Sequence, residues 1–239
     1  MNTATLRRTD FADGDSLAAG LAETVAERLR AGIAARGAAS LAVSGGRTPG
    51  RFFAALAIQD LDWAKVTVTL VDERWVRADD QRSNEGFVRR GLLQDKAAVA
   101  GFVGLVSDPE TLEETPEAGL AAVASRVAAL PRPLDAVVLG MGADGHTASF
   151  FPAGDRLKEA LDPAGDALVL PMRAAGAGEP RITLTLPVVA GARAAYLHIE
   201  GDEKAGVLAE ALEAGDAETL PIRAVLRHPD VNLQVFWCP

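Results

Sequence analysis

A histidine in a glycine-rich turn is the residue of this sequence best suited to acid–base chemistry. His146 ends the segment LDAVVLGMGADGH, in which an apolar stretch breaks into glycines, and Asp144 lies two positions before it. Imidazole is the usual general base near neutral pH, and a neighbouring carboxylate can fix its tautomer. A histidine that only caps the turn is the competing interpretation. His146 is therefore a candidate base and Asp144 its orienting group.

The segment SGGRTP, residues 44–49, has the composition of an anion-binding turn. Gly45 and Gly46 allow close approach of the backbone, while Ser44 and Thr48 add hydroxyls. A helix that starts here would present unpaired N–H groups and a partial positive charge to a phosphate. An ordinary capped turn is the alternative. The segment lacks the Gly-Lys-Ser/Thr ending of a nucleotide-binding P-loop, which disfavours a nucleoside triphosphatase.

Charged residues at other predicted element ends could contact the same ligand. Asp72, Glu73 and Arg74 close an otherwise apolar strand, and Arg74 could serve an oxyanion or a sugar hydroxyl as a permanent planar donor. A solvated strand end with an ion pair is the alternative. Arg181 begins another structured element. Lys204 falls in the first turn of a predicted helix, where a positive charge is unfavourable unless an anion binds there.

Several other kinds of site are disfavoured. The glycines at 140, 142 and 145 match a dinucleotide-binding pattern, but Pro152 follows too early and no acidic strand end comes about twenty residues later. No G-x-S-x-G elbow supports a serine nucleophile. His198 lies in an apolar strand, where a packed histidine is expected, and His228 is expected in a turn. With Cys238 as the only cysteine, we expect neither a disulfide nor a metal site.

The composition limits the kinds of ligand and partner that we expect for this protein. The net charge of −9 comes without a basic run, so nucleic acid is not expected as a ligand. No stretch approaches the ~18 apolar residues of a membrane span, and the N-terminus lacks an apolar signal core. We expect a cytoplasmic protein, a monomer or weak homo-oligomer, that binds a small molecule.

Apolar periodicity predicts alternating strands and helices. Strands are predicted at 40–46, 65–75, 101–106, 134–139, 193–201 and 232–238. Helices are predicted at 16–36, at 48–57 with Thr48 as cap and Pro49 first, and at 83–93, 116–130 and 202–212. Asp13 or Asp15 could cap the first helix and Gly37 end it, while residues 162–181 could form a flap. We expect one α/β domain, residues 1–239, with a Rossmann-like, mainly parallel sheet and helices on both faces. The informative motifs follow strand ends, where such sheets bind ligands.

Five segments resemble those of the 6-phosphogluconolactonases, both in their residues and in their order along the chain: SGGRTP, VDERWV followed by SNEG, LGMGADGHTASFFP, PRITLTLPV and EGDEKAGVL. The resemblance runs from about residue 39 to the end of the chain. The related glucosamine-6-phosphate deaminases share the fold, but they typically continue the histidine turn with Ile-Ala-Phe-Asn-Glu-Pro. They also tend to have Asp-Glu-Tyr where this chain has Asp72, Glu73 and Arg74.

The resemblance implies hydrolysis of 6-phosphogluconolactone in the oxidative pentose phosphate pathway, without metal or organic cofactor. It implies that His146, oriented by Asp144, is the catalytic base and that Arg74 contacts substrate. The implied phosphate and substrate site comprises Ser44, Gly45, Gly46, Thr48, Asp72, Arg181 and Lys204. Two alternatives stay open: an amino-sugar phosphate isomerase-deaminase with Asp72 as the base, and a sugar-phosphate sensor without turnover.

Overall fold

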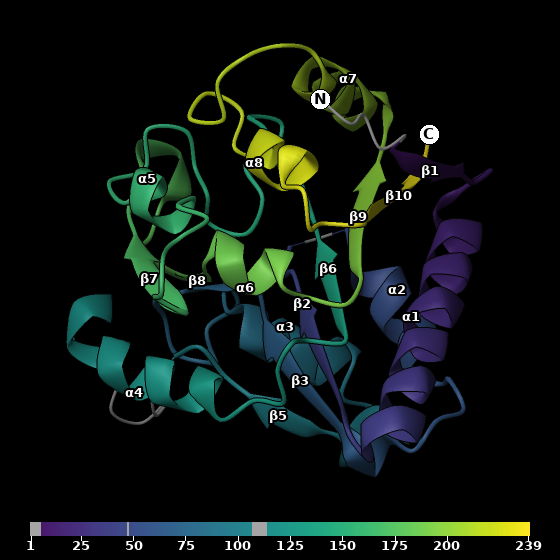
Figure 1. The fold of residues 1–239 in the computed structure, drawn as a ribbon. Coiled ribbons are helices and arrows are strands. Elements are labelled where there is room, and N and C mark those ends of the chain that lie inside the picture. Colours follow the sequence, from purple (N-terminus) through teal and green to yellow (C-terminus); the bar gives the residue numbers. More distant parts are fainter. Residues whose placement is uncertain (1–5, 47, 107–113) are drawn as a thin grey trace.

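A parallel sheet of seven strands forms the centre of the molecule (Figure 1). The computed structural model describes residues 6–46, 48–106 and 114–239. In spatial order the strands are β1 (Arg7–Asp10), β10 (Leu233–Cys238), β9 (Ala195–Glu200), β6 (Ala136–Leu139), β2 (Ala39–Val43), β3 (Val66–Leu70) and β5 (Gly101–Val103). Each neighbouring pair is parallel, which confirms the predicted sheet.

Helices cover both faces of this sheet. The connections that run toward β5 contain α1 (Gly14–Arg36), α2 (Gly50–Ala57) and α3 (Asn84–Gly91). Those that run back toward β1 contain α4 (Pro116–Ala128), α5 (Leu157–Ala160), α6 (Leu186–Ala190), α7 (Asp202–Leu212) and α8 (Ile222–Arg227). Right-handed crossovers place the two groups on opposite faces. Figure 1 shows α6 and α8 in front of the sheet and α2 and α3 behind it. Short 3₁₀ helices occupy Trp63–Lys65, Asp95–Val99 and Ala175–Ala177.

The first helix shows how the sequence sets these elements. The Ser16 backbone N–H donates to the Asp13 carboxylate at 2.8 Å, so Asp13 caps the helix start. Gly37 ends the helix in a left-handed conformation, φ 79°, that favours glycine. Between these caps, the apolar stripe from Leu17 to Leu29 is buried. The prediction for this helix is confirmed, apart from a start two residues earlier.

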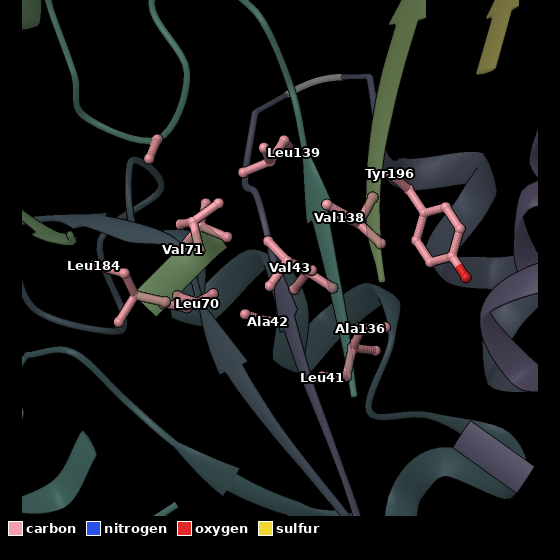
Figure 2. Close-up of a cluster of buried hydrophobic side chains, with 14 of the residues drawn as sticks. Leu41, Ala42, Val43, Leu70, Val71, Ala136, Val138, Leu139, Leu184 and Tyr196 are labelled. Atoms are coloured by element: carbon pink, nitrogen blue, oxygen red, sulfur yellow. The ribbon is translucent and has the colours of Figure 1, made fainter. Parts of the chain in front are cut away.

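The core lies on the central strands (Figure 2). All five residues of β2 are buried, and Figure 2 shows Leu41 and Val43 of β2 beside Leu70, Ala136 and Val138 of the neighbouring strands. Strands covered by helices on both faces need apolar side chains on both faces, which is why these segments are continuous apolar runs. This rigid centre supports the loops that leave its strand ends.

A second, antiparallel sheet corrects the prediction of one strand over 65–75. Its strand order is β4 (Asp72–Arg74), β8 (Arg181–Leu184) and β7 (Val169–Met172). Val71 joins the two sheets: its N–H donates to Val43 O of the large sheet, and its carbonyl accepts from the Leu184 N–H of the small one. Apolar character continues through this junction, so the sequence pattern could not reveal it. The expected flap at 162–181 is also partly strand.

Three smaller predictions were wrong. The α2 helix begins at Gly50 with Pro49 at its cap position, and no side chain caps it, so Thr48 is not the cap. Strand β5 ends at Val103, three residues before the predicted end. Strand β1 was not predicted, because its Arg-Arg-Thr-Asp sequence is exposed and polar.

The order of strands reverses between β2 and β6. From β2 the chain adds β3 and β5 on one side, whereas β6, β9 and β10 fill the other side. Connections therefore leave the carboxyl ends of β2 and β6 in opposite directions. Such a divergence opens a crevice in which α/β proteins bind ligands.

Candidate active site

A cleft of about 370 Å³ opens at this reversal, at the carboxyl ends of β2 and β6. Nine of the ten predicted site residues line it: Ser44, Gly45, Gly46, Thr48, Asp72, Arg74, His146, Arg181 and Lys204. The tenth, Asp144, holds the imidazole of His146. The structure thus brings together residues spread over 160 positions of sequence. Their individual roles remain proposals.

Two glycine turns form the floor of the cleft and are tied together. The Ser44 N–H donates to Val138 O at 2.9 Å, and the Gly140 N–H donates to the Ser44 hydroxyl oxygen at 3.0 Å. The Thr147 hydroxyl donates to the Gly140 carbonyl at 2.8 Å. The Ser44 hydroxyl therefore braces the glycine turn after β2 against the histidine turn, and it donates to no acceptor among the described residues.

The histidine turn presents an imidazole already paired with a carboxylate. His146 Nδ1 lies 2.5 Å from Asp144 Oδ1, and the ring packs against Phe151 in a tilted arrangement, with centroids 4.5 Å apart. This hydrogen bond lowers the pKa of Asp144, against the opposing effect of burial. In a neutral imidazole, an ionised carboxylate at Nδ1 favours the tautomer that carries its proton there, in which Nε2 is the basic nitrogen. That is the arrangement of a general base.

Glycine is required at position 142 to make room for this pair. A Cβ at Gly142 would overlap Nδ1 and Cε1 of the His146 ring and the Asp144 carboxylate. The Gly142 N–H also donates to the His146 carbonyl at 2.8 Å, which closes the turn. Gly145 adopts φ 73° in the same turn. Gly142 thus serves the packing of His146, whereas a Cβ at Gly145 would meet Leu220.

Two arginines occupy directly opposite positions on neighbouring strands of the small sheet. Arg74 and Arg181 are direct partners in the antiparallel register of β4 and β8. Like charges at such positions repel. Burial, with Arg74 adding repulsion, lowers the pKa of Arg181. Arg181 donates to Ala177 O at 2.7 Å and Arg74 to Arg82 O, but the Nε of each is buried without a partner among the described residues. Negative charge bound near the two guanidinium groups would offset their mutual repulsion.

Asp72 occupies the wall beside Arg181. Its buried carboxylate accepts a hydrogen bond from the Ser149 hydroxyl at 2.6 Å and lies 3.9 Å from Arg181 Nη1. The Ser149 N–H in turn contacts the Thr183 hydroxyl at 3.3 Å. Ser149 was not among the predicted site residues, and no local pattern links it to Asp72, because the two lie 77 positions apart.

Glu73, grouped in the sequence with solvated charges, is fully buried. Its carboxylate accepts from the backbone N–H groups of Arg74, Asn84 and Glu85, at 2.7 to 2.8 Å, and from the Ser83 hydroxyl at 3.1 Å. Burial raises the pKa of Glu73 to about 7, although the three N–H donors favour the ionised form. Glu73 fixes the start of α3 behind the cleft.

The opposite wall of the cleft comes from β9 and α7. Lys204 lies in the first turn of α7, as predicted, and forms no ion pair within the described ranges. His198 is buried, as expected, with Nε2 3.1 Å from Glu200 Oε1, and both residues line the cleft. Burial lowers the pKa of His198, while Glu200 opposes that shift. Glu200 also pairs with Arg51 at 3.5 Å.

The described residues contain neither a metal-binding cluster nor a membrane-spanning helix. In these ranges no group of three or more His, Cys, Asp or Glu side chains is placed to hold a metal ion. None of the helices described above is long and apolar enough to cross a membrane.

Fold and cleft together define a Rossmann-like α/β protein whose cleft combines a histidine–carboxylate pair with two arginines and a lysine. Comparison with known proteins narrows this class. The chain belongs to the glucosamine-6-phosphate isomerase/6-phosphogluconolactonase family, whose model matches residues 12–237.

Named relatives match over nearly the full length. The chain is 53% identical over 229 residues to a 6-phosphogluconolactonase of Rhizobium meliloti, covering 96% of this chain and 97% of the relative. It is 50% identical over 239 residues to one of Mesorhizobium japonicum, covering 100% and 98%. A crystal structure of a 6-phosphogluconolactonase from Shewanella baltica superposes with a TM-score of 0.93 at 41% identity, covering 99% of both chains.

Proposed function

We propose that this protein hydrolyses 6-phospho-D-glucono-1,5-lactone to 6-phosphogluconate. The observation that carries the proposal is the likeness to 6-phosphogluconolactonases over the whole chain at up to 53% identity. The cleft supports it, because the proposed base and the residues proposed to bind an anion line the same cavity of about 370 Å³. The reaction needs an activated water, stabilisation of an oxyanion and a proton for the leaving ring oxygen.

His146 supplies the proton transfers in this proposal. Its free Nε2 takes a proton from water as the water oxygen bonds to the lactone carbon C1, giving a tetrahedral oxyanion. Collapse of that intermediate breaks the bond between C1 and the ring oxygen, and the imidazolium returns the proton to that oxygen. Asp144 holds Nδ1–H throughout at its 2.5 Å contact and stabilises the transient positive charge.

The cationic groups bind and orient the substrate in this proposal. Arg74 holds oxygens at the reacting end, where one well-placed donor contributes about 3 kcal/mol to the transition state. Arg181, Lys204, the amides of Gly45 and Gly46, and the Thr48 and Ser44 hydroxyls take the phosphate. Asp72 keeps Arg181 in position. Anchoring the phosphate places C1 against His146, which converts binding energy into orientation.

The environment of Asp72 favours hydrolysis over the isomerase-deaminase alternative. A deaminase would need a carboxylate to abstract a carbon-bound proton, and the Asp72 carboxylate already accepts from Ser149 and faces Arg181. These contacts suit a carboxylate that positions a cation better than one that takes up a proton.

The test is a direct comparison of two substrates. Purified protein is supplied with freshly generated 6-phosphogluconolactone, with spontaneous hydrolysis subtracted, and separately with glucosamine 6-phosphate. We expect rapid acid release from the lactone and no ammonia from the amino sugar. Ammonia release would establish the deaminase instead, and ligand binding without any turnover would establish the sensor.

A further inference from the structure

Asn84 is a residue of the cleft to which the function proposed above assigns no role. Asn84, the first residue of α3, is almost completely buried, with only 3% of its surface exposed, yet it lines the cleft. A buried amide has two hydrogen-bonding ends, and both need partners. Its partners therefore indicate what the cleft offers a ligand at this point.

Only one end of this amide is satisfied by the protein. Asn84 Nδ2 donates to the Asp72 backbone carbonyl at 2.9 Å. That carbonyl can only accept, so the contact fixes the amide with its nitrogen toward β4. The other end, Oδ1, receives no hydrogen bond from residues 6–46, 48–106 or 114–239, and it is not one of the fully enclosed atoms without a partner, so it keeps some surface in the cleft that Asn84 lines. The cleft therefore contains a fixed, unused acceptor.

The acceptor lies against the glycine turn after β2. A Cβ at Gly45 would come within 2.8 Å of Asn84 Nδ2 and closer still to Cγ and Oδ1, so the amide fills space that only glycine leaves. Gly45 and Asn84 thus meet at the boundary between the turn proposed to hold phosphate and the wall formed by Asp72. A carbonyl oxygen does not suit the phosphate itself, because both carry negative charge. It suits a hydroxyl donor.

Asn84 is also held rigidly. Its backbone N–H donates to the buried Glu73 carboxylate at 2.8 Å, and the same carboxylate accepts the Arg74 N–H at 2.7 Å. Ser83 caps the helix beside it, accepting from the Gly86 N–H at 3.1 Å. One buried carboxylate therefore sets both Arg74 and Asn84 relative to the cleft. A group fixed in this way can discriminate between ligands, because it cannot move to find another partner.

We propose that Asn84 is a specificity-determining residue whose Oδ1 accepts a hydrogen bond from a ring hydroxyl of the sugar lactone. The proposal rests on the lactonase function proposed above. The substrate phosphate engages the glycine turn, and the neighbouring acceptor selects a polyhydroxylated ring over a deoxygenated one. A lactone without that hydroxyl leaves Oδ1 unpaired in a buried site, so it is bound less tightly in the transition state.

The test compares kcat/KM for 6-phosphogluconolactone with the values for its 2-, 3- and 4-deoxy analogues, which between them remove each ring hydroxyl. In the wild type we expect one analogue to be slower by roughly tenfold, the effect of one lost hydrogen bond. In Asn84→Ala this ratio falls to about one, because the acceptor is absent for both substrates.

Ser83→Ala is the matched control, because it loosens the start of α3 without removing the amide. We expect it to lower thermal stability and to keep the wild-type ratio for every analogue. A wild type that does not discriminate among the four lactones, or a ratio in Asn84→Ala equal to that of the wild type, would overturn the assignment. A wild type without lactonase activity would instead refute the proposed function, so the two failures are distinguishable.

Discussion

Replacing Gly142 by alanine is expected to displace the side chain of His146, the proposed base, while leaving the histidine itself in the sequence. The backbone at this position has no left-handed φ, so alanine is acceptable to the main chain. The added Cβ would, however, overlap the His146 ring and the Asp144 carboxylate. The imidazole must therefore shift by on the order of 1 Å, a misplacement that costs about 10²-fold in rate. The 2.5 Å contact between Nδ1 and Asp144 would be lost with it.

The assay is lactone hydrolysis followed by acid release, with thermal unfolding as the check on folding. We expect Gly142→Ala to lower kcat by roughly 10²-fold, within the 10²–10⁴ that a positioned base supplies. Gly206→Ala is the matched control, because a Cβ there meets nothing within 4 Å. In the interior of α7 it should stabilise by up to about 1 kcal/mol and leave kcat unchanged. A folded Gly142→Ala with more than half the wild-type kcat would refute the reasoning.

Two further predictions concern Lys204 and Glu73. Lys204→Ala should raise KM more than it lowers kcat, because the lysine is proposed to anchor the phosphate away from the reacting carbon. Steady-state kinetics measure both constants, and a loss confined to kcat would contradict this role. Burial raises the pKa of Glu73 from its usual 4.5 to about 7, so the folded state favours the neutral acid. That stabilisation is present below about pH 4.5 and is lost as pH rises through 7. The free energy of unfolding in urea should therefore fall by about 2 kcal/mol between pH 5 and 8. Glu73→Gln should lack this fall, and an identical pH dependence in the two proteins would show that Glu73 is not its source.

The sequence predicted the central sheet well, because its strands carry the simplest signal. Residues 39–43 and 136–139 are buried on both faces, so they form short apolar runs between glycines and helices. The two glycine turns follow these strands directly, and a parallel sheet brings their carboxyl ends to one edge. For the same reason His146 and Ser44 could be assigned to one site from sequence alone.

The small sheet could not be predicted in this way. Val71 passes from one sheet to the other through hydrogen bonds to Val43 and Leu184, partners that no local pattern identifies. The facing positions of Arg74 and Arg181 follow only from that long-range pairing. Glu73 and Asn84 were missed for a related reason: charged and amide side chains are normally exposed, and only the contact between β4 and α3 buries these two.

The most direct test of the central proposal compares ring opening of fresh 6-phosphogluconolactone by the wild type and by His146→Ala. Spontaneous hydrolysis is subtracted, and circular dichroism is used to confirm that both proteins are folded. We expect turnover by the wild type and a kcat lower by roughly 10²–10⁴ in the variant, which has no imidazole to activate water. Equal rates in the two folded proteins would contradict the assignment of His146 as the base.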